Sequence, residues 1–141
     1  MYKVLIIDDE VKALALLKMA IESAGYEVTT AVNGAEGMVW AIRNHPEIIV
    51  LDIKLPDIDG WEICKILKSI STTRDILVVF FTAYSGEKDM EKAKSLGADG
   101  YLTKPVDPAR MTGLFREILQ KSREVTAVER GAQKSPLHKE A

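Results

Sequence analysis

The sequence predicts an α/β fold in which helices cover both faces of a parallel β-sheet. Two observations support this prediction. Short apolar runs alternate with amphipathic helical patterns five times along the chain, which is typical of a repeated strand–helix unit. The runs are also continuous rather than alternating in polarity, as expected for strands that are buried on both sides. Because crossovers between parallel strands are right-handed, the repeat predicts a doubly wound sheet.

Five strands are expected, each a short apolar run. They lie at Tyr2–Ile7, Tyr26–Ala31, Ile48–Leu51, Ile76–Phe81 and Gly100–Leu102. The fourth run reads Ile-Leu-Val-Val-Phe-Phe and is the most strongly apolar of the five. Strands in the middle of a sheet have neighbours on both edges and helices on both faces, so we expect this strand to be central.

Five helices are expected after these strands, with boundaries marked by capping residues. They begin near Val11, Asn33, Asp59, Glu87 and Asp107. Asn33 and Asp59 are each followed three residues later by a glutamate, the pattern of a capping box. Asp107 precedes Pro108, and proline is favoured at the first position of a helix. In the second helix the apolar residues with the spacing of one helical face are Ala35, Met38, Val39 and Ile42.

The chain is expected to form one folded domain with a C-terminal tail. Its 141 residues, of which 47% are hydrophobic and 28% charged, suit one globular domain of ordinary size. Apolar patterning stops after about Ser122. We therefore assign residues 1–121 to the domain and residues 122–141 to a tail or linker, which is expected to extend the last helix and then become disordered.

Composition argues against several classes of function. The net charge is −2 and no basic stripe stands out, which argues against a nucleic-acid surface. No apolar run approaches the roughly 20 residues of a membrane span, and a strand so close to Met1 leaves no room for a signal peptide. A single cysteine, Cys64, excludes an internal disulfide and suits a reducing compartment. These features predict a cytoplasmic protein.

Polar residues follow four of the predicted strands, at the ends where open α/β sheets bind ligands. Asp8 and Asp9 follow the first strand, Asp52 the third, Thr82 the fourth and Lys104 the fifth. Clustered carboxylates raise one another's pKa unless a cation intervenes, and Mg²⁺ prefers carboxylate, water and phosphate oxygens. A carboxylate can also attack phosphorus. The sequence therefore predicts a divalent-cation site beside a nucleophilic aspartate.

Each of these residues also has a purely structural interpretation. Asp8 or Asp9 could cap the following helix, Asp52 could simply open a loop, and Lys104 could be a solvated loop lysine. Thr82 could end a strand because threonine is a good β-former. The site is favoured because matching chemistry follows four strands at once.

These residues resemble the receiver domain of two-component response regulators. The resemblance spans about Tyr2 to Lys121. It rests on the acid pair at 8–9, on Asp52 within the segment Leu-Asp-Ile-Lys-Leu-Pro-Asp-Ile-Asp-Gly, on Thr82-Ala83 and on Lys104-Pro105. It implies a flavodoxin-like (βα)5 fold with strand order 2-1-3-4-5. It also implies a phospho-accepting signalling domain rather than an enzyme.

The resemblance implies a role for each site residue. Asp52 would accept a phosphoryl group from a phosphohistidine on a sensor histidine kinase or a histidine phosphotransfer protein. Mg²⁺ would be held by Asp9, Asp52 and the backbone carbonyl of Lys54, with Asp8 acting through a water molecule. Lys104 would contact the phosphoryl oxygens.

The resemblance further implies a conformational switch. Thr82 would move to bond the phosphoryl group, and Tyr101 would rotate inward with it. The face formed by the fourth helix, fifth strand and fifth helix would then bind a downstream protein or an output domain missing from this chain. No direct contact with nucleic acid or membrane is expected.

Two other functions use similar architecture. A Mg²⁺-dependent phosphohydrolase with an aspartyl nucleophile would want a second acid two residues after Asp52, where Lys54 stands. A flavin-binding electron carrier would want a phosphate-binding loop of Gly, Ser or Thr after the first strand. That place holds Asp8, Asp9 and Glu10 instead. The phosphohydrolase is the stronger alternative.

Overall fold

The computed structural model describes residues 1–140, and side chains through residue 128. It contains one five-stranded sheet with the order β2-β1-β3-β4-β5, in which all neighbouring strands are parallel. The strands are β1 (Lys3–Ile7), β2 (Glu27–Ala31), β3 (Ile48–Leu51), β4 (Leu77–Thr82) and β5 (Gly100–Thr103). The predicted fold class and strand order are confirmed, and each strand agrees with its predicted position to within one residue at either end.

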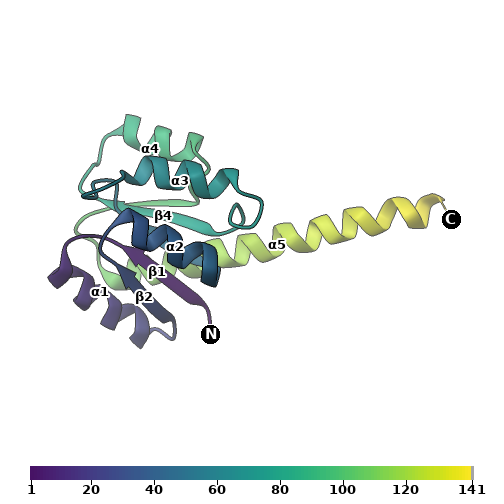
Figure 1. The fold of residues 1–141 in the computed structure, drawn as a ribbon. Helices are drawn as coiled ribbons and strands as arrows, with labels where there is room; N and C mark the ends of the chain where they lie inside the picture. Colours follow the sequence, from purple (N-terminus) through teal and green to yellow (C-terminus); the bar gives the residue numbers. More distant parts are fainter. Residues whose placement is uncertain (141) are drawn as a thin grey trace.

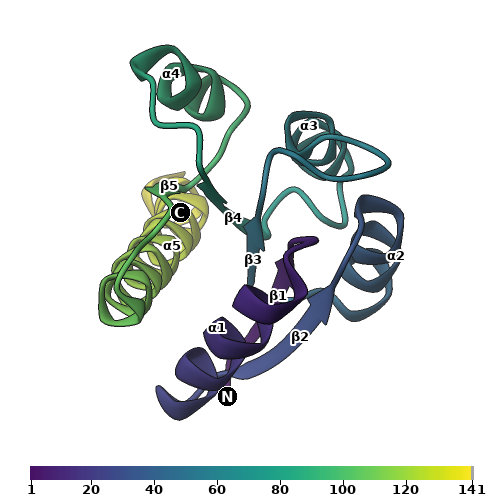
Figure 2. The same cartoon turned by 90° about the vertical axis from the view of Figure 1, so that its left-hand side faces the viewer.

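Helices cover both faces of this sheet (Figure 1). They are α1 (Val11–Ser23), α2 (Gly34–Asn44), α3 (Gly60–Ser69), α4 (Glu87–Ser95) and α5 (Pro108–Glu140). Figure 2 shows α1 and α5 on one side of the sheet and α2 and α3 on the other. No helix in the described part of the chain is both long enough and apolar enough to cross a membrane.

The strands divide the core into two layers. In β1, Val4 and Ile6 belong to the cluster that faces α1 and α5, whereas Leu5 and Ile7 belong to the cluster on the opposite side. All four side chains are fully buried. This two-sided burial explains why β1 is a continuous apolar run in the sequence.

The predicted helix caps at Asn33 and Asp59 are confirmed. The Asn33 side chain accepts a hydrogen bond from the backbone N–H of Glu36 at 2.8 Å. The Asp59 side chain accepts one from the backbone N–H of Glu62 at 2.9 Å. Both caps satisfy donors that have no partner within their helix.

The face that α2 buries differs from the predicted one. Val39 and Ile42 are 50% and 44% exposed, whereas Gly34, Gly37 and Ala41 are buried. A Cβ atom built on Gly37 would overlap the Ile7 side chain of β1. The helix therefore lies too close to the sheet for larger residues on its inner face, which glycine and alanine form instead.

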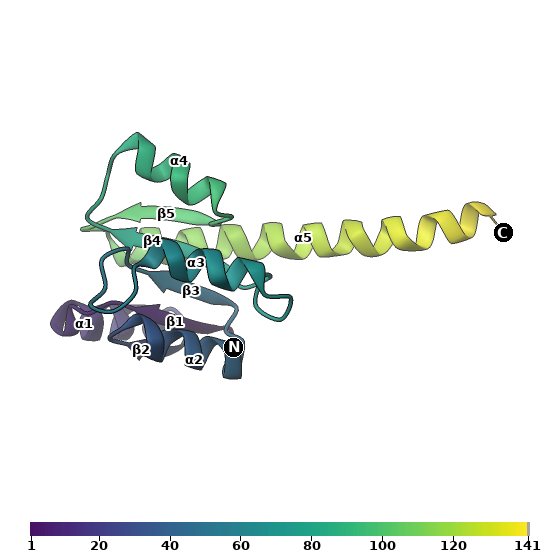
Figure 3. The ribbon, with the colours of Figure 1, turned by 45° about the horizontal axis from the view of Figure 1, so that its top comes forward.

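The last helix is longer than predicted. It runs from Pro108 to Glu140 and projects well beyond the sheet (Figure 3). Met111 and Phe115 near its start are fully buried, whereas Val125 and Val128 are 56% and 70% exposed. Residues 123–128 therefore remain helical with little packing, so their helical form rests mainly on intrinsic propensity. The division into a domain over 1–121 and a tail over 122–141 remains a prediction.

Candidate functional site

The acidic residues of the candidate site are brought together by the parallel pairing of β1 and β3. Ile7 of β1 is paired with Leu51 of β3. The next residues along each strand, Asp8 and Asp52, therefore lie side by side where the strands end. Both carboxylate residues are buried, with exposed fractions of 5% and 6%.

The Lys104 ammonium connects the two buried carboxylates. Its Nζ atom donates hydrogen bonds to Asp8 Oδ2 at 2.7 Å and to Asp52 Oδ2 at 3.1 Å. A third hydrogen bond reaches Glu10 Oε1 at 3.1 Å. Lys104 directly follows β5, so the site joins the ends of strands that are far apart in the sequence.

Backbone groups hold the remaining oxygen of each buried carboxylate. Asp8 Oδ1 accepts a hydrogen bond from the backbone N–H of Glu10 at 3.0 Å. Asp52 Oδ1 accepts one from the backbone N–H of Ile53 at 2.8 Å. In both residues one oxygen fixes the side chain and the other faces the Lys104 ammonium. The Asp52 carboxylate is thereby held in one orientation.

Burial and charge oppose each other in this cluster. Burial raises the pKa of Asp8 above its ordinary value, although the hydrogen bonds from Lys104 and from the Glu10 backbone work against it. Burial alone would lower the pKa of Lys104, but its hydrogen bonds to Asp8, Asp52 and Glu10 outweigh that effect and raise it. Lys104 therefore remains a cation at neutral pH.

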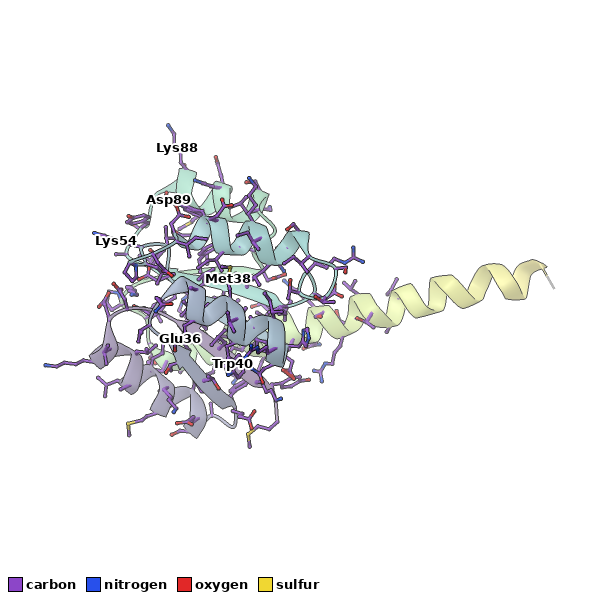
Figure 4. All side chains as sticks on the ribbon, in the orientation of Figure 1. Glu36, Met38, Trp40, Lys54, Lys88 and Asp89 are labelled. Atoms are coloured by element: carbon purple, nitrogen blue, oxygen red, sulfur yellow. The ribbon has the colours of Figure 1, made fainter. Side chains whose placement is uncertain are left out.

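A small open cavity of about 250 Å³ adjoins the cluster. Its lining residues are Asp9, Glu10, Asp52, Lys54, Thr82, Ala83, Tyr84 and Lys104. Thr82 is the last residue of β4 rather than the first after it, and it is buried. Lys54 projects outward from the loop between β3 and α3 (Figure 4). The cavity is lined mainly by charged and polar residues and is open to small polar groups from outside.

Tyr101 lies apart from this cavity. Its hydroxyl donates a hydrogen bond to the backbone carbonyl of Tyr84 at 2.5 Å, and its ring centroid lies 6.1 Å from that of Phe80. Burial, helped by the negative charges of Asp89 and Asp52, raises the pKa of Tyr101 to about 12. The hydroxyl is therefore a hydrogen-bond donor at neutral pH.

Three acidic residues are close enough to hold a metal ion together. Carboxylate oxygens of Asp8, Glu10 and Asp52 lie within 4.8 Å of one another. Such a set of hard oxygen donors fits Mg²⁺ or another divalent cation. Asp9, which the sequence suggested as a direct ligand, is exposed and lines the cavity without belonging to this group.

Glu10 is the site residue that sequence reasoning missed. It occupies the N-cap position of α1, where Ser, Thr, Asp or Asn is preferred, and its side chain makes no capping hydrogen bond. Instead its carboxylate reaches Lys104. The signal in the sequence was a third acid directly after the pair at Asp8 and Asp9.

Comparison with known proteins places this arrangement among signalling proteins. Residues 4–116 match the sequence model of the family described as the response regulator receiver domain. The alkaline phosphatase synthesis transcriptional regulatory protein PhoP of Bacillus subtilis is 39% identical over 120 residues, which is 85% of this chain and 49% of that protein. The DNA-binding dual master transcriptional regulator RpaA of Synechocystis is 38% identical over 122 residues, with coverages of 86% and 51%.

The chain thus spans about half the length of these curated relatives. A solved structure matches it over nearly all of the solved chain. The CheY-like response regulator receiver domain protein of Methanospirillum hungatei superimposes with a TM-score of 0.82 at 27% identity. The superposition covers 88% of this chain and 98% of that one.

Proposed function

Because this chain belongs to the response regulator receiver domain family, we propose that Asp52 accepts a phosphoryl group from a phosphohistidine of a partner protein. That partner would be a sensor histidine kinase or a histidine phosphotransfer protein. The observation that carries the proposal is the Lys104 ammonium, which joins the Asp8 and Asp52 carboxylates beside a small polar cavity.

The chemistry of this transfer requires little beyond positioning and neutralisation of charge. An oxygen of the Asp52 carboxylate attacks phosphorus, the bond between phosphorus and the imidazole nitrogen breaks, and the electron pair stays on that nitrogen. The product is an acyl phosphate. Lys104 lies 3.1 Å from Asp52 Oδ2, and it would neutralise charge on the incoming phosphoryl oxygens.

A magnesium ion fits the acidic side of the site. Asp9, Asp52 and the backbone carbonyl of Lys54 would hold it directly, with Asp8 acting through a water molecule. Glu10 is close enough to Asp8 and Asp52 to add a further oxygen. When bound, the ion supplies positive charge that offsets the charge of the phosphoryl group.

Thr82 and Tyr101 would transmit a conformational change from Asp52 to the surface of the protein. The backbone N–H of Tyr84 donates to Thr82 Oγ1 at 3.4 Å, and the Tyr84 carbonyl accepts from Tyr101. A shift of Thr82 toward a phosphoryl group on Asp52 would therefore disturb the hydrogen bond that holds Tyr101. Phosphorylation would then favour one of two pre-existing conformations.

The output surface would be the face formed by α4, β5 and α5. Lys88, which is exposed, and Asp89, which is half-buried, lie on α4 at the outer side of the molecule (Figure 4). We propose that this face binds a downstream protein or an output domain, and that the chain itself contacts neither nucleic acid nor membrane. We further propose that the protein acts in the cytoplasm, where it would meet the phosphoryl donors proposed above.

Intact-mass measurement tests the proposed function. After incubation with acetyl phosphate and Mg²⁺, the protein should gain the mass of one phosphoryl group and retain it through the measurement. Asp52→Asn should abolish the gain, whereas Asp59→Asn, a change in the same loop, should not. A gain that persists in Asp52→Asn would contradict the proposal. Continuous phosphate release without a retained phosphoryl group would favour the phosphohydrolase alternative.

A further inference from the structure

The loop between β3 and α3 is tied to a neighbouring helix by Asp57. Asp57 Oδ1 accepts a hydrogen bond from the backbone N–H of Gly34 at 2.8 Å, and Oδ2 accepts one from the backbone N–H of Ala35 at 2.9 Å. These donors are the first two residues of α2, more than 20 positions away in the sequence. Each carboxylate oxygen thus has its own backbone partner.

This contact is additional to the ordinary cap of α2. Asn33 already caps the helix through the N–H of Glu36. Asp57 satisfies two further first-turn donors that have no partner within the helix. Its negative charge also lies at the positive end of the helix dipole, which strengthens the attachment.

Gly34 permits the close approach on which the attachment depends. A Cβ atom at this position would overlap the side chain of Ile58 and lie 2.8 Å from Ile63 Cδ1. It would also lie 3.2 Å from Asp57 Oδ1. Any larger residue at position 34 would therefore push the loop away from the helix.

A second attachment holds the base of the same loop. The backbone N–H of Gly60 donates to the Ile53 carbonyl at 2.7 Å. A Cβ atom on Gly60 would overlap the Asp52 carbonyl oxygen, so the start of α3 lies directly against the backbone of the phospho-acceptor. Lys54, the proposed backbone ligand of the metal ion, lies between this attachment and Asp57.

The attachment through Asp57 connects the two strands that carry the buried acids. α2 packs closely on β1 where Gly37 meets Ile7, and Asp8 follows Ile7. Asp57 then links α2 to the loop that begins at Asp52. A continuous set of contacts, separate from Lys104, thus fixes the loop after β3 relative to the end of β1.

We propose that Asp57 is a positioning residue of the phospho-acceptor site, which holds the backbone at Lys54 in place for binding the cation beside Asp52. This inference rests on the proposed function. Without Asp57, the loop would lose its hydrogen bonds to α2 and keep only the attachment at its base and the packing of Leu55 and Ile58 against the core. Side-chain packing alone fixes the backbone less tightly, so the carbonyl of Lys54 would move relative to Asp8, Asp9 and Asp52. Cation binding and phosphorylation should weaken together.

Magnesium titration by calorimetry tests this role directly. Asp57→Ala should raise the Mg²⁺ dissociation constant by about tenfold, the size typical of losing a group that orients a metal ligand. Phosphorylation by acetyl phosphate at subsaturating Mg²⁺ should slow to a similar degree. Asp57→Asn keeps one acceptor oxygen and should give an intermediate value. Asp59→Asn is the matched control, because Asp59 caps only its own helix, and it should leave Mg²⁺ affinity unchanged.

Gly34→Ala tests the contact between Asp57 and α2 by a change on the helix rather than on the loop. It should weaken Mg²⁺ binding as Asp57→Ala does, and the double variant should be no worse than either single one. Unchanged Mg²⁺ affinity in Asp57→Ala, or fully additive effects, would overturn the positioning role and leave Asp57 as a structural cap. A wild-type protein that binds Mg²⁺ but gains no phosphoryl group would instead overturn the proposed function.

Discussion

At the residue scale, the site depends on the Lys104 ammonium, which three acidic side chains share. The Lys104 ammonium supplies a positive charge beside the buried residues Asp8 and Asp52, each of which directs one oxygen at it. Glu10 occupies the N-cap position of α1, but its side chain makes no capping hydrogen bond and pairs with Lys104 instead. A residue that breaks a local preference for no local gain is typical of a functional site.

Lys54 and Tyr84 are expected to control how long a phosphoryl group survives on Asp52. Both line the cavity, and Tyr84 is 42% exposed. Their bulk should restrict the approach of water to the acyl phosphate. Lys54→Asn and Tyr84→Ala should therefore lose phosphate faster. A tenfold increase would correspond to about 1.4 kcal/mol of activation free energy.

The measurement is the first-order loss of the phosphoryl mass after acetyl phosphate is removed. Met90→Ala, a change on the exposed side of α4 away from the cavity lining, serves as the control. Equal rates in all the variants would show that neither side chain shields the site.

At the element scale, strands were easier to predict than helix faces. Because β1, β3 and β4 are mostly buried on both sides, their residues form apolar runs that are visible in the sequence. The α2 helix instead packs through glycine and alanine, so the spacing of Val39 and Ile42 pointed to the wrong face. Such close approach depends on the shape of the neighbouring strand, which local periodicity does not encode.

The link between α2 and Asp57 was likewise absent from the sequence prediction. It joins two segments through backbone N–H donors. Nearly every residue type carries such a donor, so the sequence does not show which ones are used. The residues at the four strand ends were predictable because parallel strands bring their carboxyl ends to one edge. The part played by Glu10 was not, because it depends on the direction in which one side chain points.

The attachment of Asp57 to α2 should make stability depend on pH. Hydrogen bonds from the backbone of Ala35 and Gly34 lower the pKa of Asp57 below its ordinary value. The ionised carboxylate therefore favours the folded state above the unfolded pKa of about 3.9, and this contribution is lost as pH falls through the lower folded value. Wild type should melt at a higher temperature than Asp57→Asn from pH 5 to 8.

That difference in melting temperature should shrink as the pH falls below about 4, the range in which Asp57 becomes protonated. Thermal unfolding followed by circular dichroism over this range measures it. A difference that stays constant down to pH 3, or that grows as the pH falls, would show that the charge of Asp57 does not stabilise the helix.

At the scale of the whole molecule, the protein combines a tightly packed sheet with a long projecting helix. The core is closed on one face by Met111 and Phe115 of α5, both fully buried. The far part of the same helix projects beyond the sheet (Figure 1), and the side chains of residues 123–128 are exposed. Among the described side chains past that point, a hydrogen bond runs from Arg123 Nη1 to the Tyr2 hydroxyl at 3.2 Å, between exposed groups. The sequence signalled this change through the loss of apolar periodicity, but not the persistence of the helix.

The extension should therefore contribute little to the stability of the domain. A chain that ends at Lys121 removes Val125 and Val128, which are largely exposed, and keeps every buried residue of the core clusters. We expect its free energy of unfolding in urea to lie within about 1 kcal/mol of the full chain. Phosphorylation of Asp52 should be unchanged. A chain that ends at Thr103 loses Met111 and Phe115 and should not fold. If the chain ending at Lys121 were several kcal/mol less stable, the extension would have to pack against the domain, and the predicted boundary at residue 121 would be wrong.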